Sequence, residues 1–201
     1  MDQSAEKNAI RQQLRQVLRT LSPEQQQIKS QAACRNVIES PEFAAATVVM
    51  LYLSMSQEVD TAPIALRAWQ DGKTVAVPKV FMSDRSMLPV EIQSLYTGMK
   101  TTPVGVREPE VGQPIPIEII DLVLVPGLGF SPTGERIGRG GGFYDRFLAQ
   151  ANFEGTTCGL AFEQQVFESL PMLPHDQHLN MLVTDTGIRR FHTALSAHPV
   201  R

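Results

Sequence analysis

The sequence predicts an α/β domain in which an open, mostly parallel sheet is flanked by helices. Short apolar runs typical of buried strands occur at residues 46–54, 121–125 and 156–161. Helical patterns alternate with these runs, and a strand–helix–strand unit of this length favours parallel strands joined by a right-handed crossover. The length of 201 residues fits a single domain over residues 1–201, with residues 185–201 expected as a loose tail.

Composition limits the class of protein. Hydrophobic residues make up 42% of the chain, which is enough for a core, and the net charge of -3 argues against a broad nucleic-acid-binding face. The apolar runs are too short to span a bilayer, and the polar N-terminus is unlike a secretory signal. Cys34 and Cys158 lie far apart, without a metal-binding spacing. We therefore expect a cytoplasmic monomer that binds neither nucleic acid nor membrane.

The first half of the chain predicts three helices and, besides the run at 46–54, one more strand. An amphipathic helix with a basic side covers residues 4–20. A second helix covers residues 22–39, because a serine caps its start and a proline follows its end. A third helix covers residues 61–71, and a short strand covers residues 73–77.

The second half is less regular. Residues 87–92 predict a strand, and residues 94–116 predict a long connection of the kind that is often functional. A helix is expected from Gly141 or Gly142 to Gln150. Residues 163–169 predict a short helix or turn, and residues 179–184 predict the last strand.

Three loops follow the strands that are expected to be parallel. They cover residues 54–60, 126–142 and 161–165. Ligands of open parallel sheets bind at the carboxyl ends of the strands, so we expect all three loops to face one cleft.

Residues 136–145 read RIGRGGGFYD and predict an anion site. Glycines let a backbone approach a bulky anion, arginines supply forked donors that match phosphate oxygens, and the start of a helix adds partial positive charge. The pattern is neither a Walker A loop nor a complete dinucleotide fingerprint. A turn in which glycines serve sharp bends is the alternative. Asp145 fits either a first-turn helix carboxylate or a magnesium ligand beside phosphates.

The chain resembles the 5-formyltetrahydrofolate cyclo-ligase family, whose members are also called methenyltetrahydrofolate synthetases. The resemblance is carried by RIGRGGGFYDRFL, preceded by DLVLVPGLGF, and by four shorter elements. These elements are residues 7–11 (KNAIR), 53–58 (LSMSQE), 77–79 (VPK) and 174–184 (PHDQHLNMLVT). Together, the five elements extend from residue 7 to residue 184.

The resemblance implies a ligase that depends on ATP and magnesium. Such an enzyme converts 5-formyltetrahydrofolate to 5,10-methenyltetrahydrofolate and releases ADP and phosphate. The γ-phosphoryl group is transferred to the formyl oxygen, and the folate nitrogen at position 10 then closes the ring. The implied fold is that of the ribose-phosphate isomerase and CoA transferase group. Two alternatives stay open: an ATP-independent sugar-phosphate isomerase-like enzyme, and a non-catalytic homologue that binds folate or nucleotide.

The resemblance also implies individual roles. The implied ATP-binding residues are Lys7, Asn8, Ala9, Ile10, Arg11, Arg136, Ile137, Gly138, Arg139, Gly140, Gly141, Gly142, Phe143 and Tyr144. The implied folate-binding residues are Leu53, Glu58, Arg139, Gly140, Gly141, Gly142 and Phe143. Arg136 and Arg139 are the implied catalytic residues. Asp145 and Asp176 would hold Mg²⁺, directly or through water.

Some positions fall outside this pattern. The family often has Tyr-Tyr before the aspartate, where this chain has Phe143 and Tyr144, and often has Asp where this chain has Asn180. Arg15 and Arg19 lie on the basic side of the first helix, beyond the matched element. We interpret both as solvated surface charges.

Overall fold

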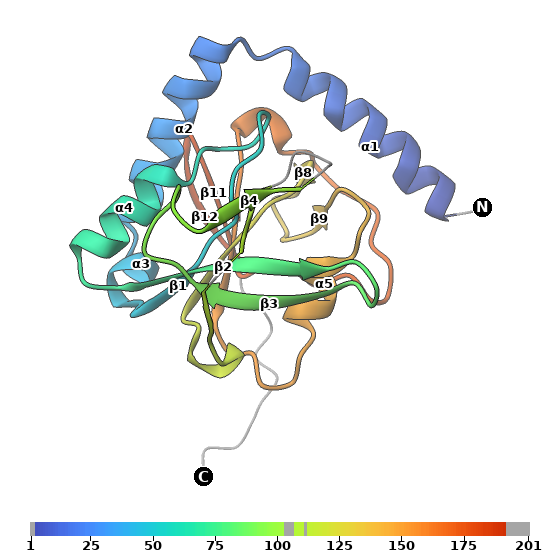
Figure 1. Cartoon of the computed structure of the whole chain (residues 1–201). Coiled ribbons are helices and arrows are strands. Elements are labelled where there is room, and N and C mark those ends of the chain that lie inside the picture. Colours follow the sequence, from blue (N-terminus) through green and yellow to red (C-terminus); the bar gives the residue numbers. More distant parts are fainter. Residues whose placement is uncertain (1–2, 103–106, 111, 192–201) are drawn as a thin grey trace.

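The computed structural model describes residues 3–102, 107–110 and 112–191 (Figure 1). In this part of the chain, five strands run parallel: β1 (Val48–Met50), β2 (Thr74–Phe81), β7 (Leu122–Val125), β10 (Thr156–Leu160) and β11 (Met181–Thr184). Three antiparallel strands extend the edges: β3 (Ser86–Glu91), β6 (Gln113–Pro114) and β12 (Gly187–Arg190). The strand order is β12-β11-β10-β7-β1-β2-β3-β6. The predicted open, mostly parallel sheet is confirmed.

Helices flank the sheet, and three of them precede the first strand in the sequence. The helices are α1 (Gln3–Arg19), α2 (Pro23–Ile38), α3 (Pro41–Ala45), α4 (Ala62–Gln70) and α5 (Phe143–Leu148), with 3-10 turns η1 (Ile117–Ile119) and η2 (Glu163–Gln165). Two short antiparallel ladders lie outside the sheet: β4 (Met99–Thr101) with β5 (Arg107–Pro109), and β8 (Gly129–Phe130) with β9 (Arg136–Ile137). No helix in the described part is long and apolar enough to cross a membrane.

The central strands are buried on both faces. Along β7, Leu122 and Leu124 pack in one cluster with residues of α1, α2 and α4, whereas Val123 and Val125 pack in a second cluster with residues of α5. Alternate side chains of a strand point to opposite faces. Two covered faces therefore explain why β7 reads as a continuous apolar run.

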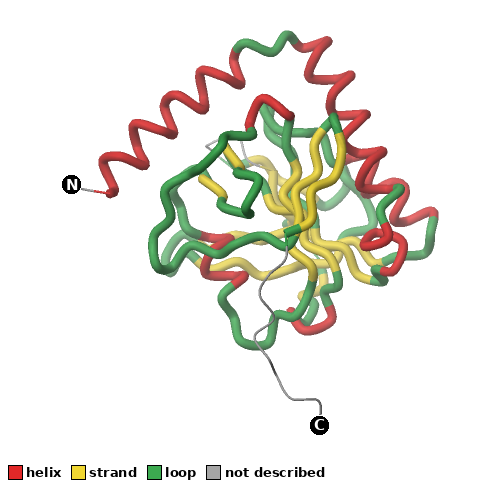
Figure 2. Tube along the Cα trace, turned by 180° about the vertical axis from the view of Figure 1, so that it is seen from behind, coloured by secondary structure: helices red, strands yellow, loops and turns green. Residues whose placement is uncertain are grey.

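Helix α1 lies across the carboxyl ends of the parallel strands. Its apolar side is buried, with Leu14 2% and Leu18 1% exposed. Gly129, which follows β7, leaves room for this packing, because a Cβ atom there would lie 2.8 Å from Leu14 Cδ1. Figures 1 and 2 show α1 and α2 joined in an arch over the sheet. The basic side of α1 is thereby placed above the loops that follow the strands.

The expected loose tail is wrong for residues 187–190. They form β12, which pairs with β11 in antiparallel register. Arg189 donates to Glu163, and Arg190 donates to Glu42. Burial alone would raise the pKa of Glu163, but bonds from Arg189 and two threonines lower it to about 2. Ion pairs to elements distant in sequence therefore order this segment. Residues 192–201 lie outside the described part.

Several element boundaries differ from the prediction. Strand β1 ends at Met50, short of the expected residue 54, and α5 ends at Leu148 rather than Gln150. Strand β2 continues through Pro78 to Phe81, because beyond Ala76 it pairs with β3 alone and Pro78 needs no further donor.

Several short elements were missed by the prediction. Helix α3 begins directly after α2, since Ser40 accepts a capping hydrogen bond from Phe43 N and Pro41 suits the first turn. The long connection over residues 94–116 contains the β4–β5 ladder and β6.

We expect Leu14→Ala to lower the free energy of unfolding by about 2–5 kcal/mol, because it leaves a cavity between α1 and the sheet. Leu66→Ala is the matched control. Leu66 is 54% exposed on α4, and its loss should change stability by about 0.5 kcal/mol or less. Urea unfolding of both variants measures the difference. Equal losses would show that α1 is not anchored through Leu14.

Candidate functional site

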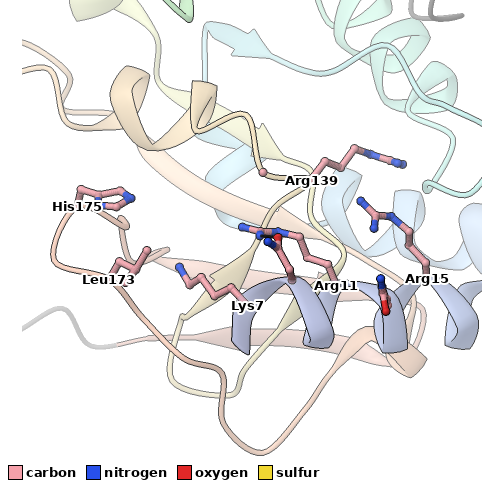
Figure 3. Close-up of a pocket in the computed structure, with 9 residues that line it drawn as sticks. Lys7, Arg11, Arg15, Arg139, Leu173 and His175 are labelled. Atoms are coloured by element: carbon pink, nitrogen blue, oxygen red, sulfur yellow. Dashed lines mark hydrogen bonds between the residues drawn. The ribbon is translucent and has the colours of Figure 1, made fainter. Parts of the chain in front are cut away.

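A basic pocket of about 690 Å³ lies between α1, the glycine-rich loop and the segment before β11 (Figure 3). It is lined by Lys7, Asn8, Arg11, Gln12, Arg15, Arg139, Gly140, Leu173 and His175. Among the residues that the structure describes, the lining contains four lysine or arginine side chains and no carboxylate. Such a surface favours a ligand that carries several negative charges.

Helix α1 supplies three of the four cations. Lys7, Arg11 and Arg15 are four residues apart, so they share one face of the helix. Arg11 Nε donates to the carbonyl oxygen of Gly138 at 3.0 Å, and its Nη1 donates to Asn8 Oδ1 at 2.7 Å. Both partners are neutral. Arg11 therefore holds the glycine-rich loop against α1 while its charge stays uncompensated.

Lys7 joins α1 to the segment before β11. Its Nζ forms an ion pair with Asp176 Oδ2, and the two side chains are only 5% and 10% exposed. Asp176 also accepts a hydrogen bond from Leu173 N at 2.5 Å. Burial alone would raise the pKa of Asp176, but the bonds from Lys7 and Leu173 outweigh burial and lower it. The carboxylate is thus held in its charged form.

Arg136 lies inside the protein, at the base of the loop. Its Nη2 donates to Asp145 Oδ1 at 2.7 Å, and its Nη1 donates to the carbonyl oxygen of Pro126 at 3.3 Å. The guanidinium carbon lies 5.9 Å from the centroid of the Tyr144 ring. Arg136 is 5% exposed and does not line the pocket, so here it holds the loop. A catalytic role for Arg136 stays a prediction.

Arg139 connects the pocket to the loop after β1. Its Nε and Nη2 donate to Glu58 Oε1 at 3.0 and 2.9 Å. Glu58 is fixed in turn by Met55 N, which donates to its Oε2 at 3.0 Å. The Arg139 side chain is 39% exposed and Glu58 9%. Two loops that are 81 residues apart therefore meet through one ion pair.

A third loop meets the same region through Gln165, in η2. The Gln165 amide nitrogen donates to the carbonyl oxygens of Gly127 and Leu128 at 2.9 and 3.2 Å. Its oxygen accepts from Phe162 N at 2.8 Å. The loop after β7 thus contacts both the loop after β1 and the loop after β10. Of the three loops, only the one after β7 contributes described residues to the pocket lining, so a cleft shared by all three loops stays a prediction. Sequence reasoning missed Gln165 itself, because a lone glutamine carries no motif.

The glycine-rich loop needs its glycines for backbone shape. Gly140 has φ +108° and Gly142 has φ +69°, a region that side chains with a Cβ rarely adopt. Gly142 also precedes α5, which has only six residues and so contributes little helix dipole. Sharp bends are therefore part of the explanation for this sequence. They also place Gly140 at the surface of the basic pocket.

One family model matches nearly the whole chain, including the residues of the pocket and of the glycine-rich loop. The model described as the 5-formyltetrahydrofolate cyclo-ligase family covers residues 3–185. The chain belongs to this family. It is 30% identical over 178 residues to the 5-formyltetrahydrofolate cyclo-ligase of Escherichia coli K12, covering 87% of this chain and 98% of that protein.

Other cyclo-ligases agree with this membership. The mouse 5-formyltetrahydrofolate cyclo-ligase is 28% identical over 184 residues, covering 87% of this chain and 91% of that protein. The solved structure of Aquifex aeolicus 5,10-methenyltetrahydrofolate synthetase aligns with a TM-score of 0.81 and 29% identity, covering 96% of each chain. The resemblance inferred from the sequence is confirmed, and the chain is a member of a family of ligases.

The other residues that the cyclo-ligase pattern implies are distributed between core and surface. Leu53 is 7% and Ile137 1% exposed, and both pack in the core. Ile10 and Phe143 pack against it, whereas Ala9 is exposed. The carbonyl oxygens of Gly141 and Gly142 accept hydrogen bonds from Arg146. The binding roles of these residues stay predictions.

Two buried polar atoms in the described part have no partner: Arg136 Nε and the Tyr144 hydroxyl. Both belong to the implied ATP-binding segment of the cyclo-ligases. Burial, and then the charge of Glu58, raise the pKa of Tyr144, so the phenol keeps its proton. These two donors lack hydrogen-bond acceptors, which a ligand or water can supply.

Neither expected magnesium ligand is free of a cation. Asp145 is bound to Arg136 and Asp176 to Lys7. Asp145 Oδ1 also accepts a hydrogen bond from Gln177 N at 3.4 Å, next to Asp176 in sequence. The described residues contain no group of three or more His, Cys, Asp or Glu side chains suited to a metal ion. A magnesium site in this cyclo-ligase stays a prediction.

Arg15, which was interpreted as a solvated charge, is partly exposed and lines the pocket. The spacing of four residues from Arg11 is the sequence signal that places it there. Arg19 is exposed, as expected. Asn180 directly precedes β11, at the amino ends of the parallel strands. Its Oδ1 accepts a hydrogen bond from Thr157 N at 2.7 Å. This contact gives Asn180 a structural role between β10 and β11.

We expect Asp176→Asn to lower the free energy of unfolding only at pH values at which Asp176 is charged. The folded pKa of Asp176 lies below its ordinary value of 3.8, so the ion pair stabilises the fold above that value. This stabilisation is lost as the pH falls through the lower folded pKa. Urea unfolding from pH 7 to acid should show the wild-type and variant curves converging. A constant gap would contradict the assignment. Asp71→Asn, at the exposed residue that follows α4, is the control.

Proposed function

We propose that this chain is a 5-formyltetrahydrofolate cyclo-ligase that uses ATP. The observation that carries the proposal is the position of Arg139. This side chain lines the basic pocket and is bound to Glu58, the residue implied to hold folate. The reaction requires the γ-phosphoryl group and the formyl oxygen to meet. A cation at the boundary between the two binding regions is suited to that task.

In this proposal the ATP phosphates occupy the pocket beside α1. Lys7, Arg11 and Arg139 supply positive charge around the phosphate oxygens, and Gly140 lets the backbone come close. Phosphoryl transfer asks the protein mainly for positioning and charge stabilisation. Arg136 acts on the nucleotide through the shape of the loop that it holds, with its free Nε as a further donor.

The folate lies on the other side of Arg139. Glu58 binds the pterin ring, because a carboxylate pairs well with adjacent N–H donors. The Arg139–Glu58 ion pair then opens as the substrate arrives, and the Arg139 fork becomes free for the phosphoryl group. Leu53 contributes packing beneath the substrate.

The chemistry needs no nucleophile from the protein. The γ-phosphoryl group moves to the formyl oxygen, the folate nitrogen at position 10 attacks the activated carbon, and phosphate leaves. The cysteines are unsuited to nucleophilic attack, because burial, and then the charge of Asp60, raise the pKa of Cys34 to about 12, and burial raises that of Cys158 further.

Magnesium enters this proposal together with ATP. Mg²⁺ usually keeps several waters and uses one or two carboxylates besides the phosphates, so a set of two aspartates fits it. Asp145 and Asp176 would hold the ion, directly or through water. The ion supplies charge neutralisation at the phosphates. In this proposal the chain is a single domain and acts as a cytoplasmic monomer.

One assay tests the function. The purified chain is incubated with 5-formyltetrahydrofolate, ATP and Mg²⁺, and the methenyl chromophore is followed by absorbance. We expect product only when ATP is present. Product without ATP would contradict the phosphoryl mechanism. Binding of both ligands by folded protein without product would favour a non-catalytic binder, and conversion of a sugar phosphate without ATP would favour an isomerase-like enzyme.

We expect Arg139→Ala to lower turnover by about 100-fold or more, because it removes charge from the transferred group. Its melting temperature should fall only moderately, because the buried Glu58 carboxylate loses its cation but keeps the hydrogen bond from Met55 N. Arg67→Ala removes an exposed arginine on α4 and should leave turnover unchanged. Unchanged turnover with a large fall in melting temperature would make Arg139 a structural residue.

We expect Asp145→Asn to raise the magnesium concentration needed for half-maximal rate, because an amide attracts the hydrated ion less strongly. The variant also leaves buried Arg136 opposite a neutral group, so some stability is lost. Rates are therefore measured against magnesium at a temperature where the variant is folded. An unaltered magnesium dependence would make Asp145 only the partner of Arg136.

A further inference from the structure

We infer that Arg15 is a further anion-binding residue of the basic pocket, where its guanidinium binds a phosphate or carboxylate oxygen of a substrate. This inference extends the proposed function and rests on it. Arg15 lies outside the KNAIR element that the family resemblance marks as ATP-binding. Its place in the fold, and not that resemblance, assigns the role.

The position of Arg15 on α1 suits it to bind a ligand of the pocket. Arg15 lines the pocket on the same face of α1 as Lys7 and Arg11. Figure 3 shows its side chain directed from α1 toward Arg139. With a rise of about 1.5 Å per residue, the row from Lys7 to Arg15 extends for roughly 12 Å along the helix. A row of this length can contact several oxyanions of a ligand, or one oxyanion from each of two ligands.

The four cations of the pocket differ in their counter-charges. Asp176 balances Lys7, and Glu58 balances Arg139. The partners of Arg11 are neutral. Arg15 has no hydrogen bond or ion pair to any residue that the structure describes, and it is only partly exposed. Among the described residues, the pocket therefore holds two cations without counter-charges, and Arg15 is one of them.

Helix α1 gains no local stabilisation from the positive charge of Arg15. Like charges four residues apart on a helix destabilise it, and Arg11 precedes Arg15 by that spacing. Arg19 is different, because it lies exposed in the last turn and complements the helix dipole. Glu6 is the sole acidic residue of α1. A bound anion would provide the balancing interaction that Arg15 lacks.

Both proposed substrates bring suitable anions. ATP brings phosphate oxygens, and 5-formyltetrahydrofolate brings the carboxylates of its glutamate. The forked donors of arginine match either group. The shared chemistry is an oxyanion with two accepting oxygens, and the two sources separate in kinetics because each substrate can be varied alone.

The test uses the full chain with Arg15→Ala, Arg15→Lys and Arg19→Ala. KM is measured for ATP at saturating folate, and for 5-formyltetrahydrofolate at saturating ATP. We expect Arg15→Ala to raise one of the two KM values by about tenfold or more, since a hydrogen bond between charged groups is lost. Arg15→Lys should recover part of the loss, because the charge stays but the fork does not. Arg19→Ala should change each KM by about twofold or less.

The melting temperature without ligand separates binding from structure. We expect Arg15→Ala to melt at or above the wild-type temperature, because a repulsion within α1 is removed.

The two KM values identify the anion that Arg15 binds. A raised KM for ATP alone assigns a phosphate, and a raised KM for folate alone assigns a carboxylate.

Two results would overturn the inference: KM values for Arg15→Ala that equal those of Arg19→Ala, or a loss confined to kcat. Failure of the wild type to form product would instead refute the proposed function. Calorimetric titration of wild type and Arg15→Ala with ATP, and separately with 5-formyltetrahydrofolate, then tests Arg15 directly. Unchanged affinity for both ligands would overturn the inference there too.

Discussion

The packing of α1 across the carboxyl ends of the parallel strands is the contact on which the site depends. Leu14 and Leu18 bury the apolar side of this helix, and Gly129 admits it closely. Because its apolar side is buried, α1 directs its basic side, with Lys7, Arg11 and Arg15, toward the glycine-rich loop. Hydrophobic burial in this way fixes the position of charges that by themselves would repel one another.

The site combines fixed charges with charges left uncompensated. Asp145 and Asp176 keep Arg136 and Lys7 in place, and Glu58 orients Arg139. The Lys7–Asp176 and Arg139–Glu58 pairs join segments that are 169 and 81 residues apart, so loss of one partner affects both segments. Arg11 and Arg15 are left with positive charge directed at the pocket. The arrangement is preorganised for an anion, which lowers the cost of ordering the site when the ligand binds.

Much of this fold could be predicted from the sequence, because buried strands and capped helices leave local signals. The run at β7, the serine cap of α2 and the loop from Arg136 to Asp145 are examples. What could not be predicted depends on pairing between distant segments. Strand β12 is ordered by Glu163 and Glu42, and the extension of β2 through Pro78 depends on the edge strand β3.

The same limit applies to the site. The glycine-rich loop, Lys7 and Arg11 were predicted, because they form contiguous motifs with a family resemblance. Burial of Arg136 and the pocket position of Arg15 were not, since both depend on how α1 and the loop pack in three dimensions. Gln165 illustrates the general case: it fixes two loops with one amide, and nothing in its sequence neighbourhood marks it.

The position of α1 has a consequence for handling the protein. Residues 20–22 are all that connects α1 to α2, and two of the three are exposed. Each central strand keeps its neighbours in the sheet if α1 is removed, since no ladder includes it. After proteolysis at this connection α1 would be held only by its packing and by the contacts of Lys7 and Arg11, and its dissociation would remove three of the four cations of the pocket while the sheet keeps its hydrogen bonds. A preparation nicked there can give a normal spectrum of secondary structure and still bind anions poorly, so intact mass is the more informative quality check.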